Sequence, residues 1–180
     1  MGRPRGFDEA QVVRSAAQLF AGRAYDGVSI DDLVTHLGLH RNSLYKTFGS
    51  KRGLYLAALR WYLEHDMAPL IDRVARAGDP GAGLREALSA PDGGGGLDLL
   101  LLAAVERAPV DAEVAELVTR TLDALDRAAA GPDDPEGGAG GLAVALTAAA
   151  LGLRIRGRAG APPGATERAC AALGRRLDHH

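Results

Sequence analysis

A short run of polar residues, His40-Arg41-Asn42-Ser43, follows Gly38 and carries side chains that can read DNA bases. A guanidinium group can donate two hydrogen bonds to guanine O6 and N7, and an amide can pair with adenine N6 and N7. Each such pair is worth about 1–3 kcal/mol of discrimination between bases. These residue types therefore predict hydrogen bonding in a DNA groove. The residues alone leave open a second interpretation, in which this polar helix is simply solvated.

Three further side chains after this run could bind phosphate groups: Tyr45, Lys46 and Lys51. Phosphate contacts fix the register of a protein on a duplex without carrying sequence information. Lys51 also lies beside an expected helix N-terminus, where backbone N–H groups favour anions. We expect all three residues to contact the DNA backbone.

Hydrophobic periodicity predicts the helices that must position these side chains. Apolar residues at helical spacing indicate one helix over residues 8–22, a second over 30–37 and a short third over 40–47. Gly38 supplies the residue tolerant of positive φ that a tight turn between the last two requires. Two short helices joined by such a turn are the geometry of a helix-turn-helix, whose second helix enters the major groove.

Two serines are placed to begin helices. Ser29, with Asp32 three residues later, resembles a capping box for the helix over 30–37, with Asp in place of the usual Glu. Ser50 can cap a fourth helix, on which Leu54 and Ala58 share an apolar face.

The charges of the chain divide unevenly along its length. Residues 1–60 hold nine lysines and arginines against five acids, whereas the remaining 120 residues hold twelve against eighteen. A basic N-terminal part on an acidic body is expected of a protein that touches phosphate at one end only. Chance clustering on a solvated surface is the alternative interpretation.

The run from Ser29 to Leu54, SIDDLVTHLGLHRNSLYKTFGSKRGL, closely resembles the N-terminal signature of the tetracycline-repressor (TetR) family. The preceding AAQLF of residues 16–20 and GVSI of residues 27–30 extend the match. The resemblance covers about residues 8–62, and Leu-Tyr-x-x-Phe-x-Ser-Lys lies at the family spacing after the glycine turn.

This resemblance implies a sequence-specific transcriptional regulator that binds a palindromic operator as a homodimer. It also implies repression that is relieved by a small ligand. Carried over residue by residue, Ser29 caps the second helix and can meet a phosphate, His40 to Ser43 lead the recognition helix, and Tyr45 and Lys51 hold the DNA backbone. His40 departs from the Ser or Thr often found there. Gly53 replaces a frequent acid and leaves the fourth helix without a capping box.

The N-terminal residues Arg3 and Arg5 flank Pro4 and could reach into an adjacent minor groove. A disordered tail is the alternative interpretation of this arm.

Beyond the fourth helix the sequence predicts only further helices, so the expected fold class is all-α. We expect a helix-turn-helix domain over residues 1–50 and a ligand-sensing and dimerisation domain over residues 51–180, with the helix from about residue 51 linking them. Pro69 could break or kink a helix. Further helices are expected over 82–90, 97–108, from Asp111 onward, 142–157 and 164–177, with loose Gly-rich segments at 91–96 and 131–141.

Every aromatic residue lies within the first 62 positions, so the C-terminal core is expected to be aliphatic. An unidentified small effector of largely apolar character fits such a core better than a flat cationic drug does. Residues predicted to line a ligand pocket are Trp61, Tyr62, His65, Leu101, Leu102 and Val105.

The last two expected helices carry apolar and small residues that suit a homodimer face. Two helices from each subunit would then form a four-helix interface. The residues predicted at this face are Leu142, Leu146, Ala149, Leu153, Ala169 and Leu173.

Enzyme motifs are missing from the sequence: there is no nucleophile elbow, no Cys/His pair and no dinucleotide fingerprint. His36 and His40 are four residues apart, but Gly38 separates them, so no metal site and no cofactor are expected. The single cysteine, Cys170, fits a reducing cytoplasm, and neither a signal peptide nor a membrane span is expected. A helical scaffold without DNA binding is the remaining alternative, and it leaves the charge division unexplained.

Overall fold

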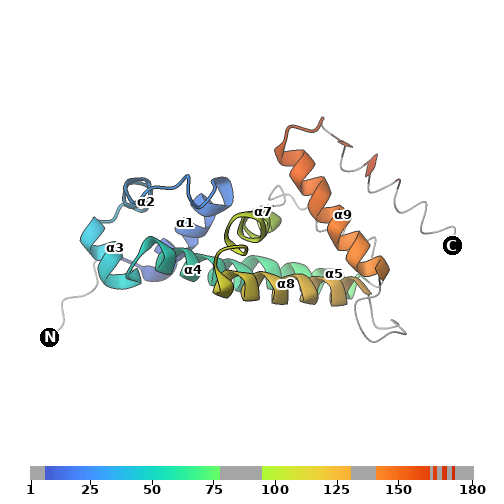
Figure 1. Ribbon diagram of the computed structural model, residues 1–180, viewed down its shortest axis with the longest axis horizontal. Coiled ribbons are helices and arrows are strands. Elements are labelled where there is room, and N and C mark those ends of the chain that lie inside the picture. Colours follow the sequence, from blue (N-terminus) through green and yellow to red (C-terminus); the bar gives the residue numbers. More distant parts are fainter. Residues whose placement is uncertain are drawn as a thin grey trace.

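The computed structural model describes residues 7–77, 95–130 and 141–162, together with residues 164, 165, 168, 169 and 172. Every regular element among them is helical, which confirms the predicted all-α class. Figure 1 shows α1, α2 and α3 gathered at one end of an elongated molecule and α9 toward the other. The elements are α1 (Glu9–Gly22), α2 (Ile30–Leu37), α3 (Arg41–Phe48), α4 (Lys51–Tyr62), the π-helical turn η1 (Leu63–Met67), α5 (Ala68–Arg76), α7 (Gly95–Leu102), the π-helical turn η2 (Ala103–Arg107), α8 (Ala112–Ala130) and α9 (Gly141–Arg158).

The N-terminal helices begin and end where local chemistry predicts. Asp8 caps α1 by accepting hydrogen bonds from the backbone of Ala10 at 3.0 Å and of Gln11 at 3.4 Å. Ser29 and Asp32 form the predicted capping box of α2, with each side chain accepting from the other residue's backbone N–H. These caps satisfy N–H groups that the first turn of a helix leaves without partners.

The proline predicted to break or kink a helix does not interrupt it. Pro69 lies in the first turn of α5, directly after η1, so α4, η1 and α5 follow one another without a loop. The backbone N–H of Ala68 bonds to the carbonyl of Leu63, five residues earlier, as in a π-helical turn. Because the first turn of a helix can accommodate a residue without an N–H, the helix continues through Pro69.

One continuous hydrophobic core runs from the N-terminal helices into the C-terminal ones. Phe20 of α1 packs edge-on against Tyr55 of α4, with ring centroids 5.0 Å apart. Leu99 and Leu100 of α7 are almost completely buried, and Leu125 of α8 joins the same core. The aliphatic core expected for the C-terminal part is therefore present among the described residues. In the same described ranges, no helix is long and apolar enough to cross a membrane.

The helix expected over residues 97–108 begins earlier and changes its winding. Its first part is α7, which starts at Gly95, and its second part is η2. Asp111 then precedes α8, as expected of its cap. The expected helix over 82–90 and most of the one over 164–177 lie outside the described residues, as does the loose segment at 131–140.

Candidate nucleic-acid interface

The turn between α2 and α3 has the backbone that the sequence requires. Gly38 ends α2 in the left-handed region at φ 62° and ψ 30°, and its N–H bonds to the carbonyls of Thr35 and Val34. Glycine reaches this region without steric cost. His40 then begins α3 as its N-cap with no hydrogen bond from its own side chain. Position 40 therefore lacks the side-chain cap that Ser or Thr would supply, and the imidazole is exposed.

The third helix is amphipathic in the sense that a DNA-reading helix needs. Leu44 is completely buried and anchors α3 against the core. Arg41 and Asn42 are exposed, and Ser43 is half-buried. Arg41 and Asn42, both predicted to reach base edges, are thus presented to solvent. The opposite side of α3 packs on the core through Leu44 and the partly buried Phe48.

Arg41 forms an ion pair with Asp31 on this surface. Its guanidinium donates a hydrogen bond to the carboxylate of Asp31, on the first turn of α2. This hydrogen bond raises the pKa of Arg41. The pairing of Asp31 with Arg41 could not be predicted from sequence spacing, because the two residues belong to different helices.

The predicted phosphate-binding residues lie around α3 with different exposures. Tyr45 is 41% exposed although it is aromatic, and Lys46 is exposed on the same helix. Ser29 is exposed at the start of α2, where its hydroxyl bonds to Asp32. The arm residues Arg3 and Arg5 lie outside the described residues.

Lys51 lies in a more enclosed position than a free surface lysine. Its ammonium sits 4.0 Å from the centre of the Tyr25 ring, an attractive arrangement between a cation and an aromatic face. The guanidinium of Arg107, from η2, lies 4.4 Å from the centre of the same ring. Burial lowers the pKa of Lys51, and the positive charge of Arg107 acts in the same direction, whereas Asp26 opposes it.

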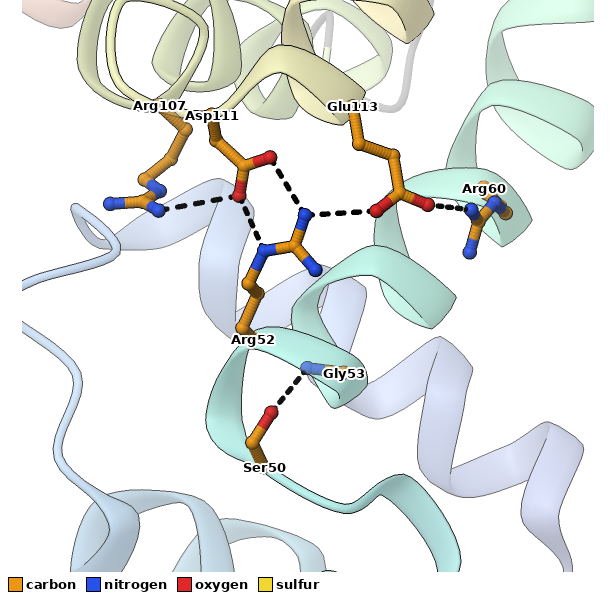
Figure 2. A network of polar contacts seen from close by, with 7 residues as sticks. All are labelled: Ser50, Arg52, Gly53, Arg60, Arg107, Asp111 and Glu113. Atoms are coloured by element: carbon orange, nitrogen blue, oxygen red, sulfur yellow. Dashed lines mark hydrogen bonds and ion pairs between the residues drawn. The ribbon is translucent and has the colours of Figure 1, made fainter.

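A polar network ties the start of α4 to the start of α8 (Figure 2). Arg52 binds both carboxylate oxygens of Asp111, at 2.7 and 2.8 Å, and also donates to Glu113 at 2.9 Å. Glu113 in turn accepts from Arg60, in the last turn of α4, and Arg107 approaches Asp111 at 3.4 Å. The helix that follows α3 is therefore bound directly to the start of α8.

Two residues at the start of α4, Ser50 and Gly53, determine its local backbone structure. Ser50 accepts a hydrogen bond from Gly53 N–H at 3.0 Å, as its predicted capping role requires. A Cβ atom at Gly53 would lie 2.0 Å from the carbonyl oxygen of Phe48, so the close approach of the α3–α4 connection needs glycine here. Steric contact with Phe48 thus explains why glycine occupies position 53, where the family often has an acid.

The six residues predicted to line a ligand pocket do not all face one interior space. Tyr62 and Leu101 are buried, and Trp61 and Leu102 are half-buried. His65 is exposed, with its ring stacked on Trp61 at 4.5 Å and its Nδ1 2.9 Å from the Trp61 carbonyl oxygen.

Val105 is 69% exposed, so the expectation that it faces an interior pocket does not hold within the single chain. The prediction assumed an α-helix through this segment. The wider turn of η2 rotates the side chains that follow α7 relative to that helix.

The predicted dimer-face residues also divide between two sides of α9. Leu142 is 57% exposed, Leu146 is buried at 8% exposure, and Ala149 and Leu153 are half-buried. Ala169 is half-buried, and Leu173 lies outside the described residues. The exposed apolar side chains that α9 adds to Leu142 are Val144 and Ile155.

Comparison with known proteins agrees with this geometry. The family model described as "Bacterial regulatory proteins, tetR family" matches residues 12–58. The HTH-type transcriptional regulator YezE of Bacillus subtilis (strain 168) is 35% identical over 135 residues, which cover 71% of this chain and 69% of YezE. The HTH-type transcriptional repressor BdcR of Escherichia coli (strain K12) is 39% identical over 71 residues, covering 39% and 36% of the two chains.

A solved structure extends the similarity over almost the whole length. The TetR family regulator CifR, as a cysteine mutant complexed with a 26 bp double-strand operator DNA, superposes with a TM-score of 0.73. It is 26% identical and covers 98% of each chain. The match to YezE over two thirds of both sequences, the family model and this fold lead to one conclusion: the chain belongs to the TetR family of DNA-binding transcriptional regulators and is not an enzyme.

Proposed function

We propose that this protein is a repressor that binds a palindromic operator as a homodimer and leaves it when a small, largely apolar ligand binds the C-terminal part. The observation that carries this proposal is the outward presentation of Arg41 and Asn42 on a helix anchored by the buried Leu44. BdcR, which is named a repressor, supports the direction of regulation.

Within this proposal the residues around α3 divide into two roles. Arg41 and Asn42, with His40 and Ser43 beside them, read base edges in the major groove. A second set holds the phosphates on either side and fixes the register. That set is Ser29, Tyr45, Lys46 and Lys51, with Arg3 and Arg5 of the N-terminal arm in a flanking minor groove.

The chain is proposed to work as two parts, residues 1–50 for DNA and residues 51–180 for ligand and dimerisation. The network of Figure 2 supports a role for α4 as the connection, because Arg52 and Arg60 bind carboxylates at the start of α8. A ligand that moved α8 would therefore pull on the helix that directly follows α3.

The exposed side of α9 supports the proposed homodimer. Leu142 and Ile155 are apolar and exposed, and Ala145, Ala148 and Gly152 lie between them. A Cβ atom at Gly152 would meet no other atom within 4 Å. Small residues on an apolar helix face allow a second helix to approach closely, and Ala149 and Leu153 border this face. Leu146 is buried in its own core. Ala169 and Leu173, of the helix expected over residues 164–177, are proposed to extend the interface.

A small apolar effector is proposed to bind near Trp61, Tyr62, Leu101 and Leu102, where α4 meets α7. The hydroxyl of Tyr62 is buried in this region and hydrogen-bonds with the backbone of Leu100, and burial raises the pKa of Tyr62. Such a site would take a mainly aliphatic molecule. The protein is proposed to act in the cytoplasm, with no cofactor.

Titration of the full chain against a random duplex at two salt concentrations tests DNA binding. We expect affinity to fall steeply as salt rises, because bound cations release counterions from the phosphates. Selection from a random duplex pool should then recover a palindrome. Light scattering at micromolar concentration should show a dimer, and a monomer in that measurement would contradict the proposed assembly.

A further inference from the structure

A second polar cluster, separate from the network of Figure 2, joins α9 to α7 and α1. Its centre is Asp98 of α7, which is only 8% exposed. Arg154 of α9 binds both of its carboxylate oxygens at 2.7 Å through Nε and Nη2. Arg158, one turn later, places Nη1 3.0 Å from the same carboxylate. A buried carboxylate needs such partners, and two arginines of one helix supply them.

Arg158 continues from this cluster to the DNA-binding end of the molecule. The same Nη1 donates to the backbone carbonyl of Ala21 at 3.0 Å, across 137 residues of sequence. One terminal nitrogen of Arg158 thus forms an ion pair with Asp98 of α7 and a hydrogen bond with Ala21 of α1. In Figure 1, α7 lies between α1 and α9, as this bridge requires.

The backbone carbonyl oxygen of Ala21 is free to accept a hydrogen bond from a cation outside α1. Ala21 lies in the last turn of α1, where carbonyl groups lack partners within the helix and carry partial negative charge. The last turn of α1 contains no basic residue of its own. Arg158 therefore supplies from α9 the cation that usually comes from the helix itself.

We propose that Arg158, held by Asp98 beside Arg154, is a positioning residue that sets the orientation of the DNA-binding module relative to α9. The inference rests on the proposed function, in which the opposite side of α9 forms the dimer interface. Each DNA-binding module is then held in a fixed orientation relative to the dimer axis by its contact with α9. This orientation determines which separation of two operator half-sites the dimer can bind.

The chain offers a matched control for the test. Arg127 is exposed on α8, outside the side of α9 proposed for the dimer. Arg158→Met keeps the aliphatic stem and removes the donors, and Arg127→Met makes the same change where no bond to α1 or α7 is lost. Arg158→Lys restores a cation, so it should recover part of any effect. Thermal unfolding and light scattering establish that each variant is folded and dimeric.

The first measurement uses duplexes that carry the half-sites recovered by selection, at the native spacing and at spacings changed by up to two base pairs, together with a single half-site. Arg158→Met should reduce the preference for the native spacing by about tenfold, the change expected for losing a hydrogen bond to a charged group. The affinity of Arg158→Met for the single half-site should match the wild type, and so should both quantities for Arg127→Met. A wild-type spacing preference in Arg158→Met would overturn the inference, as would an equal loss on the half-site.

The second measurement needs no DNA and separates this inference from the proposed function. A spin label at Asn42→Cys in a Cys170→Ser background reports the distance between the two recognition helices of a dimer. We expect a single narrow distance distribution for the parent and for Arg127→Met, and a broader one for Arg158→Met. Equal widths in all three would reject the positioning role even if operator binding were established. A label that reports no partner at all would reject the homodimer, and the inference with it.

Discussion

The guanidinium of Arg41, on the first turn of α3, donates a hydrogen bond to the carboxylate of Asp31 on the first turn of α2. Both side chains are exposed, at 52% and 78%, so the pair adds little to folding stability. The pair is expected to affect DNA binding instead. The carboxylate holds the guanidinium on the outer surface of the two helices, and it opposes any phosphate that approaches the same place.

Replacing Asp31 should therefore weaken discrimination rather than binding. Asp31→Asn removes one negative charge from the proposed interface, and we expect affinity for a random duplex to rise about two- to fivefold. Affinity for the selected palindrome should rise less, so the ratio of specific to non-specific binding falls. Fluorescence anisotropy with both duplexes measures this ratio. Asp72→Asn, an exposed carboxylate on α5, is the control. A fall in random-duplex affinity for Asp31→Asn would show that Asp31 has no such role.

The two proposed classes of DNA contact should respond differently to mutation. Lys51→Ala should lower affinity for every sequence and reduce the slope of log K against log salt by about one, since one phosphate contact is lost. Arg41→Ala should relax base preference at one position of the operator, with a loss of about 1–3 kcal/mol of discrimination between bases. Salt titrations with matched and mismatched duplexes separate the two. Arg120→Ala on α8 should leave both quantities at their wild-type values. If Lys51→Ala changed base preference as Arg41→Ala does, the assigned roles would be wrong.

Asp111 should make stability depend on pH in a defined acidic range. Hydrogen bonds from Arg52 lower the pKa of Asp111 from 3.8 to about 2, while burial opposes the shift and the Val114 backbone assists it. A carboxylate with a lowered pKa in the folded state stabilises the protein above its unfolded pKa. That stabilisation, about 2 kcal/mol at neutral pH, is lost as pH falls from about 4 toward 2.

The test is Asp111→Asn, which can still cap α8 but carries no charge. Urea unfolding should show a lower free energy of unfolding than the wild type at pH 7. The difference between the two proteins should shrink as the solution is acidified below about pH 4, because the wild-type carboxylate then becomes neutral as well. A difference that stayed constant over that range would mean that the ion pair with Arg52 does not stabilise the fold.

Gly53 should resist substitution although it lies in a helix. Gly53→Ala places a Cβ atom 2.0 Å from the Phe48 carbonyl oxygen, which forces the backbone between α3 and α4 to move. We expect a loss of about 1–3 kcal/mol of unfolding free energy. At Gly22, at the end of α1, a Cβ atom would meet nothing within 4 Å. Gly22→Ala should therefore be neutral or stabilising by up to about 1 kcal/mol, the usual gain from replacing glycine. Thermal denaturation compares the stability of both variants with that of the wild type. A Gly53→Ala variant as stable as the wild type would contradict the steric argument.

Local features could be derived from the sequence because neighbours along the chain produce them. The capping box of Ser29 and Asp32 and the left-handed Gly38 involve contacts over a few residues. Hydrophobic periodicity likewise placed the first helices and the buried Leu44, since one helix face must meet the core. The identity of the family followed from the same local segment.

Contacts between distant segments were decided only by the tertiary structure. Arg52 meets Asp111 and Arg158 meets Ala21 because helices far apart in sequence pack side by side, and no spacing rule relates those positions. The predicted pocket residue Val105 lies within the π-helical turn η2 and is exposed, because the wider winding of this turn directs its side chains differently from an α-helix. The sequence by itself therefore determined the DNA-reading unit, which is built from local interactions. The packing of the helices determined how that unit is held against the rest of the chain.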